Sequence, residues 1–115
     1  MGASVRFYES AASIQASPAA VWAVLIDAPN YPNWDSGVVG VEGSIRPGEK
    51  IKVVSSANPG RAFPVTVAAF EPERRMVWSG GMPLGLFKGV RTFTLTPEGE
   101  GTGFTMREEL SLIHI

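Results

Sequence analysis

The sequence contains no cysteine, and its one histidine, His114, lies near the end of the 115-residue chain. The lack of cysteine excludes disulfides, thiolate metal ligands and thiol catalysis, and it is typical of proteins from a reducing compartment. A nucleophilic triad needs a histidine or an equivalent base, which this chain does not offer at a convincing position. The remaining metal ligands would be carboxylates, and these lie mainly in turns such as Glu71 to Glu73. We therefore predict no metal site and no cofactor.

Charge and long apolar runs are also scarce. Charged residues make up 18% of the chain, the formal net charge is −1, and the lysines and arginines are scattered. A nucleic-acid-binding protein usually carries a basic stripe, so we expect no nucleic-acid partner. No apolar run reaches membrane-spanning length, and the N-terminus lacks the layout of a signal peptide. A hydrophobic content of 44% is typical of a globular domain, and we expect a cytoplasmic protein without an integral membrane segment.

One stretch, residues 17–34, predicts helical structure. Ser17 is a suitable N-cap, and Pro18 takes the first helical position, where its missing N–H has no cost. Pro29 ends this helix because the residue before a proline is driven away from helical angles. Residues 30–34 then predict a turn or a short second helix. The apolar side of the first helix, which includes a tryptophan assigned to the core, consists of Val21, Trp22, Leu25 and Ile26.

The rest of the chain follows the period of two that is typical of strands. The expected strands cover residues 4–15, Val39 to Ile45, 51–54, 63–69, 76 onward, 87–96 and 102–109. Short turns between consecutive strands predict an antiparallel meander. One buried face also fixes the register of the last hairpin. The cross-strand pairs are Leu95 with Phe104, Phe93 with Met106, and Arg91 with Glu108.

The final six residues, 110–115, do not follow the strand pattern. The codons CTG-TCT-CTT-ATA-CAC-ATC encode these six residues, and that string is a transposon-end adapter used in sequencing libraries. We interpret residues 110–115 as a non-native tail and residues 1–109 as an incomplete domain. A natural, short apolar tail is the alternative. On the adapter hypothesis, His114 carries no functional weight.

The order of these elements resembles the START-like or helix-grip superfamily, also called SRPBCC. The stretches that carry the resemblance are Ile14–Trp22, Asp27–Trp34, Pro47–Gly48, Val77–Gly81 and Thr102–Glu109. The resemblance implies an α+β fold in which a curved antiparallel sheet grips a long C-terminal helix around an apolar cavity. This sequence has no such helix, so we expect the fold with short N-terminal helices and without the C-terminal one.

Members of this superfamily include polyketide cyclase- and dehydratase-like proteins, lipid-transfer domains and coenzyme-Q-binding proteins. The resemblance therefore implies a small hydrophobic ligand, such as a lipid, a polyketide or a quinone, on the concave face of the sheet. Plain core packing is the alternative role for the aromatic candidates. The glycine-rich segment 80–85 is either a lip over the pocket or an ordinary loop. The candidate ligand-binding residues are Trp34, Trp78, Met82, Phe87, Arg91, Phe93, Phe104, Met106 and Glu108.

Arg91 and Glu108 are the polar pair of greatest interest. They either orient a polar group of a ligand, with Glu108 as a candidate catalytic acid or base, or form an ordinary cross-strand ion pair worth roughly 0.2–1 kcal/mol. Three functions remain open: a carrier of a hydrophobic molecule, an enzyme of the cyclase or dehydratase type, and a protein-binding module that uses the sheet.

Overall fold

The computed structural model describes residues 5–35, 37–56, 59–60, 62–81 and 87–112, except for the side chains of residues 5–7, 81, 87 and 112. Within these ranges the strands form one antiparallel sheet of seven strands in the order β1-β7-β6-β5-β4-β3-β2. The elements are β1 (Val5–Ile14), α1 (Pro18–Leu25), η1 (Ala28–Asn30), α2 (Tyr31–Trp34), β2 (Val38–Glu42), β3 (Lys50–Ser55), β4 (Ala62–Glu71), β5 (Arg75–Gly81), β6 (Phe87–Glu98) and β7 (Gly101–Leu112).

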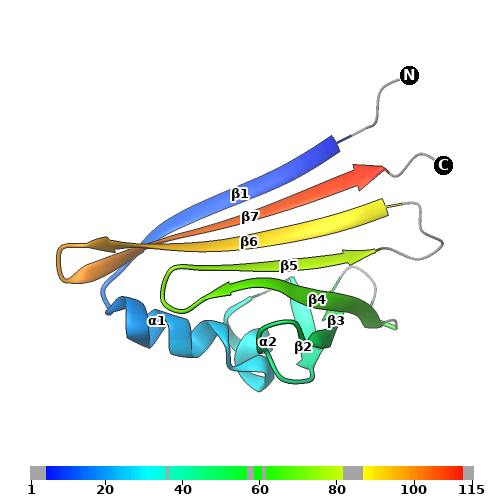
Figure 1. The fold of residues 1–115 in the computed structure, drawn as a ribbon, viewed down its shortest axis with the longest axis horizontal. Coiled ribbons are helices and arrows are strands. Elements are labelled where there is room, and N and C mark those ends of the chain that lie inside the picture. The colour runs from blue at the N-terminus through cyan, green and yellow to red at the C-terminus, as the bar shows by residue number, and fades with distance from the viewer. Residues whose placement is uncertain (1–4, 36, 57–58, 61, 82–86, 113–115) are drawn as a thin grey trace.

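The sheet is curved, and the short helices lie on its concave side, as Figure 1 shows. The first and last strands pair with each other along their whole length, from Val5 opposite Ser111 to Ile14 opposite Thr102. Helices α1 and α2 lie near one end of the concave face, whereas β1, β7 and β6 continue past them (Figure 1). This is the α+β arrangement of a helix-grip fold. Among the described helices, none is both long and apolar enough to cross a membrane.

The helix α1 begins as its sequence predicts. The hydroxyl of Ser17 accepts a hydrogen bond from the backbone N–H of Ala20 at 3.2 Å, and Pro18 is the first helical residue. Val21, Trp22 and Leu25 are buried, but Ile26 is 37% exposed. The expectation that Ile26 belongs to the apolar side of the helix was wrong. The helix ends at Leu25, so Ile26 lies outside it.

The second helix of the predicted pair is also present. Pro29 lies within the 3-10 turn η1, and the single-turn helix α2 follows it directly. The hydroxyl of the fully buried Tyr31 donates a hydrogen bond of 2.5 Å to the carbonyl oxygen of Leu25. This bond ties α2 to the end of α1. Burial raises the pKa of Tyr31 above its ordinary value, so the group stays a neutral donor.

The predicted register of the last hairpin is confirmed. Leu95 pairs with Phe104, and Arg91 pairs with Glu108, as the period of two requires. Strand β7 runs to Leu112, past the expected end at Glu109, and its last residues pair with β6 and β1. The hypothesis that residues 110–115 are not native stays a prediction.

Strand β2 departs from simple alternation. Val38 and Val41 are buried, whereas Val39 is 50% exposed. The pairing with β3 shifts register between Val38 and Gly40, and this irregularity moves Val39 to the outer side. A strict period of two would place Val39 on the same face as Val41, and the register shift is the reason that the structure differs. A second register shift, between Val67 and Ala69, adds to the bend of β4 against β5.

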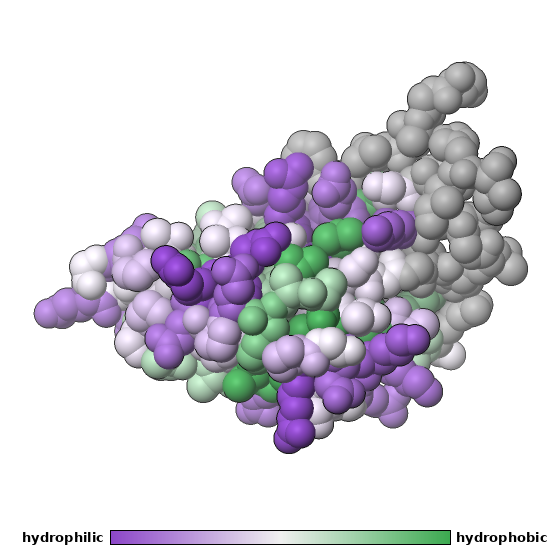
Figure 2. Space-filling model, in the orientation of Figure 1, coloured by the Kyte–Doolittle hydropathy of each residue, from purple (hydrophilic) through white to green (hydrophobic). Residues whose placement is uncertain are grey.

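The core lies between the short helices and the concave face. Aromatic rings form its centre: Tyr31 contacts Trp34 and Trp78 at centroid distances of 4.7 and 5.2 Å. Trp78 meets Phe93 edge-on at 5.1 Å. Figure 2 shows apolar side chains between polar ones in the middle of the visible face. Aromatic residues bury large areas, so this cluster provides much of the hydrophobic stabilisation.

We predict that Phe93→Ala destabilises the fold by about 3–5 kcal/mol, because it removes a fully buried ring from the centre of the core. The matched control is Val39→Ala on the exposed side of β2, which should change the free energy of unfolding by about 0.5 kcal/mol or less. Urea denaturation followed by circular dichroism measures both. Equal effects of the two substitutions would contradict the assignment of the core.

Candidate functional site

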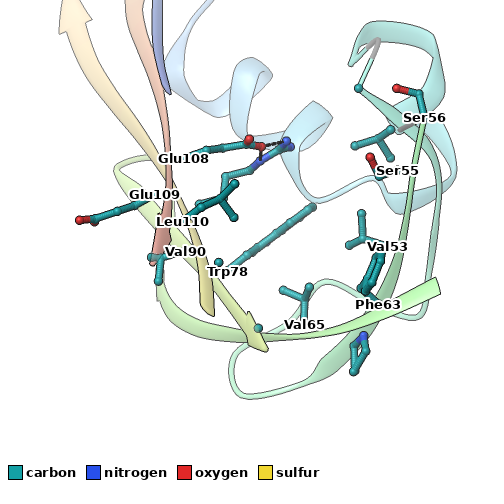
Figure 3. Close-up of a pocket in the computed structure, with 16 residues that line it drawn as sticks. Val53, Ser55, Ser56, Phe63, Val65, Trp78, Val90, Glu108, Glu109 and Leu110 are labelled. Carbon is teal, nitrogen blue, oxygen red and sulfur yellow. Dashed lines mark hydrogen bonds and ion pairs between the residues drawn. The ribbon is translucent and has the colours of Figure 1, made fainter. Parts of the chain in front are cut away.

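A pocket of about 520 Å³ lies on the concave face, and no residue of α1 lines it. Its wall combines the ends of β3, β5 and β7 with the starts of β4 and β6. This volume is within the range of about 300–1,000 Å³ that is typical of small-molecule sites. Figure 3 shows the arrangement of the side chains around it. The apolar residues of the wall include Val53, Phe63, Val65, Trp78 and Leu110.

Two glycines leave part of this wall without side chains. Gly80 of β5 pairs with Gly89 of β6, and alternation places both on the same face as Trp78 and Arg91. A Cβ atom at Gly80 would lie 2.6 Å from the carbonyl oxygen of Pro64, which is too close, so the sheet bends tightly there. A Cβ atom at Gly89 would meet only ordinary contacts, the nearest at 3.4 Å from Leu110 Cδ2.

Arg91 and Glu108 form the polar side of the pocket, and Asp35, which does not line it, binds the same arginine. Arg91 Nε donates to Glu108 Oε1 at 2.6 Å, and Arg91 Nη2 donates to the same oxygen. Arg91 Nη1 donates to Asp35 Oδ2 at 2.7 Å. The side chains are 15% exposed for Arg91, 8% for Asp35 and 37% for Glu108. Arg91 therefore connects the end of α2 to β7, and only Glu108 is well exposed.

The electrostatics keep the arginine charged. Burial lowers the pKa of Arg91, but the attraction of Glu108 and then of Asp35 outweighs this effect and raises the pKa above its ordinary value. The guanidinium group also lies 5.9 Å from the ring centroid of Trp78 and 5.8 Å from that of Phe93. These rings add a cation–π attraction to the ion pairs.

Asp35 is the functional candidate that the sequence did not suggest. It follows Trp34 directly at the end of α2, and its carboxylate also accepts a hydrogen bond from the backbone N–H of Gly37 at 3.0 Å. It is one of the two buried polar or charged residues in the described part of the chain. Its only signal in the sequence is an acidic residue at the end of a short proline-containing helix, and nothing in that pattern points to Arg91.

The predicted site residues fall into three groups. Trp78, Arg91 and Glu108 line the pocket together. Phe93 is fully buried in the core, and its neighbours Trp34, Phe104 and Met106 are partly buried against the same core. Met82 lies outside the described residues, as does most of the glycine-rich segment 80–85, and the side chain of Phe87 is not described. A ligand-binding role for any of these residues stays a prediction.

Trp78 belongs to both the core and the pocket. The residue is 3% exposed, and its indole N–H is buried without a hydrogen-bond partner within the described part of the chain. The residue therefore presents apolar ring surface, and not its donor, to the pocket. No group of three or more histidine, cysteine or acidic side chains that could hold a metal occurs among the described residues.

The comparison with protein families identifies the architecture. Residues 5–113 match the model of the family "polyketide cyclase / dehydrase and lipid transport". The chain belongs to this family. Its membership and its fold confirm the resemblance to the START-like superfamily. A search of curated proteins finds no match to the sequence.

Solved structures of family-like proteins share the fold. Mll3558 from Rhizobium loti is 21% identical over 99% of this chain and 84% of its own, with a TM-score of 0.72. A START superfamily protein from Mycobacterium smegmatis is 14% identical over 94% of this chain and 78% of its own, also with a TM-score of 0.72. DynU16, a protein in the dynemicin biosynthetic locus, is 22% identical over 89% of this chain and 36% of its own, with a TM-score of 0.68.

We predict that Arg91→Ala destabilises this family member by about 3–5 kcal/mol, because it leaves the buried carboxylate of Asp35 without its cation. The loss of the ion pair with Glu108 contributes less to this destabilisation, because solvent screens the side chain of Glu108. The matched control is Arg75→Ala, which removes an arginine from an ion pair whose side chains are about half exposed. This control should cost about 0.5 kcal/mol or less in urea denaturation. Similar losses for both substitutions would contradict the structural role of Arg91.

Proposed function

We propose that this chain binds a small hydrophobic molecule of the lipid, polyketide or quinone class in the pocket on the concave face. The observation that supports it best is the composition of the pocket wall. Apolar side chains surround a volume of about 520 Å³, and one compact polar cluster, Arg91 with Glu108, lies at its side. Such a wall provides hydrophobic burial for affinity and a few polar groups for orientation. The description of the family supports the same class of ligand.

The proposal assigns different tasks to the two parts of the wall. Trp78, Phe63 and Leu110 remove apolar ligand surface from water, which provides most of the binding free energy. Arg91 is already held by two carboxylates, so it can hold a ligand oxygen without a large loss of conformational entropy. A cytoplasmic location and the absence of a nucleic-acid partner are also part of the proposal.

Filling the pocket tests the proposal. We predict that Gly89→Leu reduces the affinity for the neutral hydrophobic dye Nile red by about tenfold or more, because the new side chain projects into the pocket, where a Cβ atom meets no close contact. Fluorescence titration measures the dissociation constants. The control is Gly40→Leu in β2, a strand glycine that has open space around it and does not line the pocket. Equal affinity of the native protein and Gly89→Leu would contradict binding in this pocket.

The alternative function, an enzyme of the cyclase or dehydratase type, has one observation in its favour. Glu108 presents a partly exposed carboxylate to an otherwise mostly apolar pocket, and a positioned carboxylate is a candidate general acid or base for a cyclase or dehydratase step. A protein-binding role of the sheet has no comparable support from the pocket.

If the protein is such an enzyme, we expect Glu108→Gln to reduce the turnover of a reactive polyketide chain by about a hundredfold. The affinity for Nile red should stay within about threefold. Product formation measured by liquid chromatography, beside the dye titration, separates the two quantities. A carrier gives stoichiometric binding and no product with either protein. Equal turnover by the native and variant proteins would remove Glu108 from the chemistry.

A further inference from the structure

We infer that the pocket selects neutral ligands that carry a hydroxyl group over ligands that carry a carboxylate. This inference rests on the proposed function, because it specifies the ligand of the same pocket. It follows from the charge balance at the polar side of the pocket and from the hydrogen-bonding positions that the ion pairs leave available.

The charge balance is negative. Asp35 and Glu108 carry one negative charge each, and Arg91 carries the one positive charge between them, so the cluster sums to −1. Among the described lining residues, Arg91 is the only cation. Glu109 also belongs to the lining, but its side chain points away from the pocket in Figure 3. A ligand carboxylate would therefore meet a guanidinium that is already neutralised and a carboxylate of its own sign.

The hydrogen-bonding positions favour a hydroxyl group. Both bonds from Arg91 to Glu108 end on the same oxygen, Oε1. These bonds leave the other oxygen, Oε2, available to accept a hydrogen bond from a ligand hydroxyl. A guanidinium group has five N–H donors, and the bonds shown here use three of them. A hydroxyl can donate to Glu108 and accept from Arg91 at once, whereas a carboxylate can only accept.

Glu108, and not Asp35, faces the ligand. The side chain of Glu108 is 37% exposed and lies on the pocket wall (Figure 3), whereas that of Asp35 is 8% exposed and is not part of the lining. Asp35 acts through Arg91, because it takes up part of the positive charge that a ligand anion would otherwise use. Selectivity therefore depends on Glu108 directly and on Asp35 indirectly.

The test compares 2-naphthol with 2-naphthoate at pH 7 by isothermal titration calorimetry. The two ligands share the same ring system, and only the second is charged. We expect 2-naphthol to bind about tenfold more tightly or better. Glu108→Gln keeps an oxygen acceptor for Arg91 and removes the negative charge, so it should improve the affinity for 2-naphthoate about tenfold. Its NH2 group replaces the acceptor Oε2, so the affinity for 2-naphthol should not rise, and the affinity ratio should shift toward 2-naphthoate by about tenfold or more.

The matched control is Glu109→Gln, which removes the same charge from the adjacent residue on the other face of β7 and should leave the affinity ratio unchanged. A second measurement needs no variant: methyl 2-naphthoate removes the charge from the ligand, and it should bind the native protein about tenfold more tightly than 2-naphthoate does. This comparison holds even where Glu108→Gln fails to fold.

The outcomes separate the two proposals. Equal or tighter binding of 2-naphthoate by the native protein overturns the selectivity, as does an unchanged affinity ratio in a folded Glu108→Gln variant. Failure of 2-naphthol to bind a protein that binds Nile red also overturns the selectivity, and the proposed function stands. Failure of Nile red and of both naphthyl ligands to bind overturns the proposed function itself.

Discussion

The double ion pair of Arg91 is the interaction on which the site depends. Removing a guanidinium group and a carboxylate from water is costly, and the Coulomb attraction repays this cost only where the geometry is good. Arg91 meets that condition because three of its N–H groups bond to carboxylate oxygens on two elements. One of these elements is the end of α2, and the other is β7. The pair thus fixes the position of the short helices over the concave face and sets the charge of the pocket.

The curvature of the sheet determines where space remains for a ligand. The register shifts in β2 and β4 and the close approach of Gly80 to Pro64 bend the sheet around its concave side. Helix α1 and the aromatic cluster fill one part of that side. Toward the other end, the facing Gly80 and Gly89 contribute no side chains, so the wall is formed by residues that stand further apart. The pocket is consequently a part of the concave face that the core does not fill.

The sequence predicts the local features well and the tertiary ones poorly. The cap at Ser17 and the pairing of Arg91 with Glu108 follow from short-range rules, namely N-cap chemistry and the period of two in a hairpin. The exposure of Val39 could not be predicted, because a bulge changes the face of a strand without changing its composition. The role of Asp35 could not be predicted either. Its partner is 56 positions away along the chain, and only the curl of the sheet brings the two together.

The core and the pocket are joined through Trp78. Its ring packs against Tyr31 and Phe93 inside the core, and the same residue forms part of the pocket wall beside Arg91. A ligand that covers this wall extends the packed interior outward and shields the ion pairs from water, which strengthens them. A ligand that binds only the folded state also stabilises that state by mass action. In this fold, binding a hydrophobic molecule and completing the core are therefore one and the same physical process.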